Sequence, residues 1–149
     1  MTPQQIALVQ SSWQQVLPIR CVAADLFYAR LFEVAPDVRT LFRRDVHAQG
    51  AMLMAMLDTV VGGLGRLDEL LPTAQALARR HVGYGVRPAH YDSVGVALLW
   101  TLEQGLGPAF CAELRSAWAS AYQLLADAMK EAAYGGDGEL PPPRAERLA

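Results

Sequence analysis

Few side chains in this sequence could bind a metal or attack a substrate. There are three histidines, His47, His81 and His90, and two cysteines, Cys21 and Cys111. The cysteines stand far apart without a Cys-x-x-Cys pair, so they indicate neither a zinc site nor a disulfide framework, and we expect them to be small buried fillers. The common hydrolase, metalloprotease and nucleotide-binding motifs are missing. A cofactor that needs one axial ligand is the remaining route to metal chemistry, and haem is the common one.

His81 has the surroundings that best suit an axial ligand. It ends the segment LPTAQALARRH, and Leu77 lies one helical turn before it on the same side. Its ring could point into an apolar space while Arg80 reaches outward to an anionic group at the rim. Taken alone, this feature fits an ordinary histidine at a helix end better, because the helix dipole favours one there.

Tyr28 and Gln49 are polar residues in apolar helical patterns. Tyr28 stands among aromatic and aliphatic residues, and Gln49 leads a helix face that continues through Leu53 and Met56. A phenol and an amide can both donate hydrogen bonds. Taken singly, each residue also fits an ordinary role, as a core tyrosine and as a solvated glutamine.

Proline spacing and apolar periodicity predict an all-helical chain. Helices are expected near 3–16, 19–34, 36–42, 45–64, 72–84, 88–106 and 109–133, and strand patterns are missing. Thr2 and Gln5 form a predicted capping box. Six of the nine prolines stand where a helical pattern begins, because a first-turn N–H has no partner within the helix: Pro3, Pro18, Pro36, Pro72, Pro88 and Pro108.

Length and composition fit one domain. The chain has 149 residues, of which 52% are hydrophobic, enough for a sizeable core. We expect a domain over 1–134 and a Pro-rich, disordered tail over 135–149. The net charge of −2 argues against a nucleic-acid surface. A signal peptide and a membrane span are not expected, so the cytoplasm is the predicted location.

Several segments together resemble a known family. LFYARLF, APDVRTLF, ALARRHVGYGVRPAHYDSVGVALL and AWASAYQLLA are similar to the bacterial single-domain haemoglobins and to the haem domain of flavohaemoglobins. The stretch Tyr91–Phe110 also resembles neuroglobin, and the similarity covers roughly residues 3–131. The resemblance implies an all-α globin fold, with helices A–C and E–H in a three-over-three sandwich around haem b.

The resemblance also implies roles for individual residues. His81 would be the proximal iron ligand, with Arg80 near the haem propionates. On the distal side, Tyr28, Gln49 and Leu53 would face a bound gas. The other cofactor-binding residues would be Phe42 wedged against the haem, Tyr91 orienting the imidazole, and Met56, Leu77, Val86, Val94 and Leu98 lining the pocket.

Two departures from the flavohaemoglobin pattern matter. The late glutamate of that pattern falls on Gly135 here, and Glu131 lies one turn too early. The proximal relay from histidine through tyrosine to glutamate is therefore in doubt. The flavin and nicotinamide domains have no counterpart in the sequence, so reduction of the iron would need a separate reductase.

The implied function is reversible binding of O2, and of NO and CO, at ferrous iron, with high O2 affinity, for oxygen binding, transport or storage. The alternatives are a nitric oxide dioxygenase served by a separate reductase and, less favoured, a haem-based gas sensor. A monomer or weak homodimer is expected. The sequence leaves open whether the sixth iron position is free, holds water, or is taken by Tyr28, Gln49 or His47. His90 is expected to be exposed.

Overall fold

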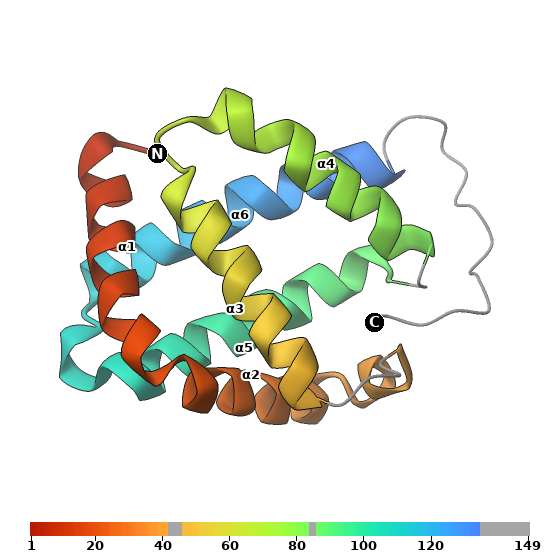
Figure 1. Cartoon of the computed structure of the whole chain (residues 1–149), viewed down its shortest axis with the longest axis horizontal. Helices are drawn as coiled ribbons and strands as arrows, with labels where there is room; N and C mark the ends of the chain where they lie inside the picture. Colours follow the sequence, from red (N-terminus) through yellow and green to blue (C-terminus); the bar gives the residue numbers. More distant parts are fainter. Residues whose placement is uncertain (42–45, 84–85, 135–149) are drawn as a thin grey trace.

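The computed structural model describes residues 1–41, 46–83 and 86–134, and its regular structure there is entirely helical (Figure 1). Short 3-10 helices join some of the α-helices: η1 (Leu17–Ile19), η2 (Pro36–Leu41) and η3 (Gly107–Ala109). The α-helices are α1 (Pro3–Val16), α2 (Arg20–Val34), α3 (Val46–Gly62), α4 (Leu67–Gly83), α5 (Pro88–Leu106) and α6 (Ala112–Tyr134). The all-α prediction is confirmed.

Local capping fixes where the first helix begins. The Thr2 hydroxyl accepts a hydrogen bond from the Gln5 N–H at 3.1 Å, and the Gln5 side chain accepts one from the Thr2 N–H at 3.0 Å. Two backbone donors that no helical carbonyl could reach are thereby satisfied. The capping box predicted from the sequence is present.

Pro72 does not begin a helix, and this expectation was wrong. Helix α4 begins at Leu67, so Pro72 lies inside it. Asp68 and Glu69 occupy its first turn, where carboxylates interact favourably with the helix dipole. The missing N–H of Pro72 leaves one backbone hydrogen bond unmade close to the helix start, where its loss interrupts little of the helix.

The helices form two layers of three. Helices α1, α3 and α4 lie over α2, α5 and α6 (Figure 1). Helices α1 and α4 pack on α6, whereas α3 packs on α2, and α5 lies between α2 and α6. The three-over-three arrangement of the globin fold is confirmed. Among the described residues, no helix is both long and apolar enough to cross a bilayer.

The buried side chains form two clusters. The larger joins α1, α2, α3, α5 and α6 and includes Trp13, Tyr28 and Trp118. The smaller joins the second half of α4 to α5 and the end of α6, through residues such as Ala78 and Tyr91. Tyr122 of α6 packs against both clusters. The expected distal tyrosine and the expected proximal tyrosine therefore lie in different parts of the core.

Both cysteines are exposed free thiols, so the expectation that they fill the core was wrong. Cys21 lies in the first turn of α2 between Arg20 and Val22, which are exposed as well. Cys111 precedes α6 and is followed by the exposed Ala112. Their small size fitted a core position, but Cys21 stands on the solvent face of α2, and Cys111 lies in the exposed connection before α6.

Candidate functional site

Tyr28 is buried inside the larger cluster. It is 4% exposed, and its ring meets Phe27 edge-on with the centroids 5.1 Å apart. Burial raises the pKa of the Tyr28 phenol well above its ordinary value of 10.0, because the charged form would lose its solvation. The hydroxyl therefore keeps its proton at physiological pH and can act as a donor.

Gly50 brings α3 against α2 beside Tyr28. A Cβ built on Gly50 would lie 2.9 Å from the Cβ of Ala24 and 3.9 Å from Cε2 of Tyr28. Only a residue without a side chain allows so close an approach. Sequence reasoning missed this residue, although a glycine inside a helical pattern is a known sign of close packing.

The contact at Gly50 also determines where Gln49 and Leu53 lie. Gln49 precedes Gly50 on α3, and Leu53 lies about one helical turn after Gln49. The side-chain oxygen Oε1 of Gln49 is buried and has no hydrogen-bond partner among the described residues. Leu53 packs against the cluster that contains Tyr28, and Met56 is half-buried. This buried oxygen can only accept a hydrogen bond, whereas the amide nitrogen of the same side chain is the atom that could donate to a bound gas.

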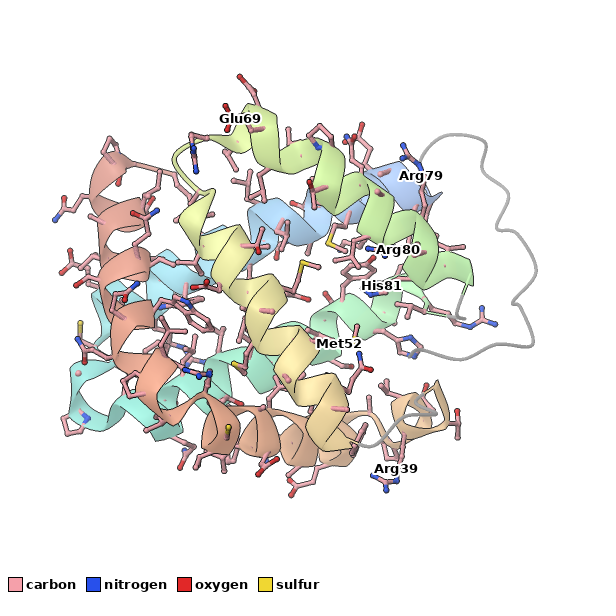
Figure 2. All side chains as sticks on the ribbon, viewed as in Figure 1. Arg39, Met52, Glu69, Arg79, Arg80 and His81 are labelled. Carbon is pink, nitrogen blue, oxygen red and sulfur yellow. The ribbon has the colours of Figure 1, made fainter. Side chains whose placement is uncertain are left out.

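His81 lies near the C-terminal end of α4, next to the exposed Arg80 (Figure 2). Burial is the main reason that the pKa of His81 falls from 6.5 to about 4, and the positive charge of Arg80 lowers it further. The imidazole is therefore neutral at physiological pH. A neutral ring has a lone pair to offer a metal, whereas an imidazolium has none.

Hydrogen bonds on both sides fix Val86, which lies just before α5. The Val86 N–H donates to the His81 carbonyl at 3.0 Å, and the Tyr134 hydroxyl donates to the Val86 carbonyl at 2.6 Å. Leu77 and Val86 both pack on the smaller cluster. Val86 is thus tied both to the end of α4 and to the end of α6.

Tyr91 is the buried phenol of the smaller cluster, with 6% of its surface exposed. Its hydroxyl has no hydrogen-bond partner in the described part of the chain. Burial, and then the neighbouring Tyr134, raise its pKa above the ordinary value of 10.0, so this phenol also stays protonated. The Tyr91 hydroxyl and Gln49 Oε1 are thus two buried polar atoms without a partner in the described part of the chain.

The remaining predicted residues are divided between the two clusters or lie outside the described part. Val94 and Leu98 of α5 pack in the larger cluster with Tyr28 and Leu53. Phe42 lies outside the described residues, as do Gly135 and the predicted tail, and so does the side chain of His47 within α3. Glu131 is exposed.

These residues fit a cofactor with one axial site. One partly buried imidazole has a lowered pKa, a buried phenol on another helix keeps its proton, and the buried oxygens of Gln49 and Tyr91 have no hydrogen-bond partner among the described residues. Haem needs such a set: an axial base in a dry pocket and polar groups for its ligand and periphery.

Comparison with known proteins agrees with this chemistry. A protein-family model described as Globin matches residues 25–129, which include Tyr28, Gln49, His81 and Tyr91. The chain belongs to the globin family. This globin is thus a haem protein with small gas ligands such as O2.

The globin is also similar to several flavohemoproteins. It is 38% identical to that of Bordetella bronchiseptica over 104 residues, which are 68% of this chain and 26% of the relative. It is 36% identical to that of Chromobacterium violaceum over 106 residues, 69% and 26% of the two chains. For Xylella fastidiosa (strain Temecula1) the identity is 28% over 133 residues, 87% and 33%. The chain spans about a quarter to a third of the length of these relatives.

Proposed function

We propose that this globin binds haem b through His81 and holds O2 on the opposite side with hydrogen bonds from Tyr28 and Gln49. The haem supplies the iron at which a gas binds. The observation that carries the proposal is the place of His81, partly buried in the last turn of α4 and next to the exposed Arg80, and its lowered pKa agrees with a neutral imidazole. We assign the pocket lining to Phe42, Leu53, Met56, Leu77, Arg80, Val86, Tyr91, Val94 and Leu98.

Tyr28 and Gln49 would favour O2 over CO. O2 draws electron density from ferrous iron and becomes a good acceptor, while CO carries little negative charge. A hydrogen bond inside a dry pocket contributes on the order of 1–3 kcal/mol, or roughly ten- to a hundredfold in release rate. The protonated, buried phenol of Tyr28 is suited to that role. The expected result is tight O2 binding with slow release, for oxygen binding, transport or storage.

A second candidate function is nitric oxide dioxygenase activity. The similarity to flavohemoproteins favours it, together with slow O2 release, since O2 must stay bound until NO arrives. The electrons would have to come from a separate reductase. Steady NADH-dependent NO consumption in the presence of a reductase, and its absence without one, would support the enzyme over the carrier. We further propose a cytoplasmic location and a monomer or weak homodimer.

The absorption spectrum of the ferrous protein, with and without CO, tests the proposed ligand. The wild-type chain purified with excess haem should give a spectrum of histidine-ligated haem that changes sharply with CO. His81→Gly should lose that coordination signature and regain it when free imidazole is added. The matched control is His47→Gly, which tests a sixth ligand and should leave the CO form unchanged. An unaltered spectrum in His81→Gly would overturn the proposal.

A further inference from the structure

His90, in the first turn of α5, is largely covered rather than exposed. Only 14% of its side chain is accessible, so the expectation of an exposed histidine was wrong. The reason is that both of its ring nitrogens have partners. The Arg87 N–H is 3.0 Å from Nδ1, and a carboxylate oxygen of Asp37 is 3.0 Å from Nε2.

These two contacts fix the tautomer of the ring. Since the Arg87 N–H can only donate, Nδ1 must accept, and the hydrogen of a neutral imidazole then sits on Nε2. Nε2 donates that hydrogen to Asp37, and this hydrogen bond is the main cause of the lowered pKa of the Asp37 carboxyl. The same ring therefore caps α5 and bonds to η2.

The bond joins two segments that are distant in the sequence and border the candidate site. η2 follows α2, which carries Tyr28, and Val38 anchors it in the larger cluster. The first turn of α5 follows Val86 and contains Tyr91, in the smaller cluster. Among the described side chains, His90 and Asp37 provide the hydrogen bond that connects η2 to α5.

We infer that His90 is a positioning residue that clamps η2 to α5 and so holds the edge of the haem site closed against loss of haem. The inference rests on the proposed haem binding. The clamp needs Nδ1 as the acceptor of the N–H that caps α5 and Nε2 as the donor to Asp37.

The charged groups around the ring are few in the described part of the chain. Asp37 faces it from η2, and Arg87 precedes it at the start of α5. Arg39, also on η2, instead lies over the Phe32 ring, with its guanidinium carbon 5.0 Å from the ring centroid. The ring of His90 is thus held between a donor at the start of α5 and an acceptor on η2.

Transfer of haem from the ferric protein to an excess of a haem-free acceptor globin measures the clamp. At pH 7.5, His90→Leu and Asp37→Ala should each release haem roughly two- to tenfold faster than wild type, the effect of one lost hydrogen bond. His90→Gln should restore slow release, because its amide has an acceptor oxygen and a donor nitrogen. Asp68→Ala, which removes an exposed carboxylate from α4, is the matched control and should change nothing.

Hydrogen exchange and the rescue by His90→Gln separate a clamp from mere structural support. Hydrogen exchange of the Arg87 amide, which needs no haem, should quicken in His90→Leu and not in His90→Gln. Wild-type release rates in both His90→Leu and Asp37→Ala would overturn this inference alone. A chain that takes up no haem would overturn it together with the proposed function.

Discussion

The ring of Tyr122 occupies the space that a side chain at Gly95 would need. A Cβ on Gly95 would lie 2.8 Å from Cε2 of Tyr122, closer than packed carbon atoms come. The hydroxyl of the same ring donates to the Tyr91 carbonyl at 2.5 Å. Helices α5 and α6 are thereby locked together next to the buried phenol of Tyr91.

Gly95→Ala should lower the free energy of unfolding by about 1 kcal/mol, since overpacking costs roughly 1–3 kcal/mol and exceeds the gain of about 1 kcal/mol in helix propensity. In a Tyr122→Ala background the space is free, so the same substitution should stabilise the chain by about 1 kcal/mol. Urea denaturation of the four proteins of this double-mutant cycle gives the comparison. A stabilising Gly95→Ala in both backgrounds would contradict the packing described here.

Tyr28→Phe should speed O2 dissociation roughly ten- to a hundredfold, because it removes the donor to bound O2 and leaves the ring. CO dissociation should change little. Stopped-flow mixing measures both rates. Tyr122→Phe removes a phenol hydroxyl that donates to the Tyr91 carbonyl, and it serves as the control for the loss of a buried hydroxyl. If O2 leaves Tyr28→Phe at the wild-type rate, Tyr28 has no place at the distal site.

Gln49→Leu should affect stability and gas binding in opposite directions. In the haem-free chain it removes a buried oxygen that lacks a partner, so the free energy of unfolding should rise by about 1 kcal/mol. In the haem-loaded chain it removes a donor, so O2 release should become faster. Chemical denaturation and O2 dissociation together check both signs. A loss of stability without haem would show that the Gln49 oxygen is satisfied in solution.

The stability of the haem-free chain should fall as the pH drops from about 6.5 to 4. The pKa of His81 is about 4 in the folded chain and 6.5 in the unfolded chain. As the pH falls through this window, the unfolded chain gains a proton that the folded chain does not, so unfolding becomes easier. The loss attributable to His81 is about 3 kcal/mol. Denaturation of wild type and His81→Leu at pH 7 and pH 4.5 isolates it, and equal pH dependence would contradict the burial of the ring.

Most of the helices could be predicted because residues next to a helix end determine where that helix begins. The Thr2–Gln5 box and the prolines at the starts of α1 and α5 act on neighbouring residues. The predicted start of α4 near Pro72 is wrong because this proline lies inside the helix. Asp68 and Glu69 mark its first turn.

The site could be predicted only where a residue's own neighbours reveal its environment. Apolar periodicity around Tyr28 was enough to suggest burial, and its burial is found. The close approach at Gly50 and the bond between His90 and Asp37 depend on how distant segments meet. No local pattern encodes such a distance. The exposure of Cys21 shows the same limit, since size alone does not tell which face of a helix meets solvent.

The contact between Gly50 and Ala24 determines how closely α3 approaches α2. A methyl group at Gly50 would meet the Cβ of Ala24 and push the two helices apart. Gln49 and Leu53 would then move with α3. A one-carbon substitution at this crossing is therefore the smallest change that could enlarge the space beside Tyr28 for a larger ligand.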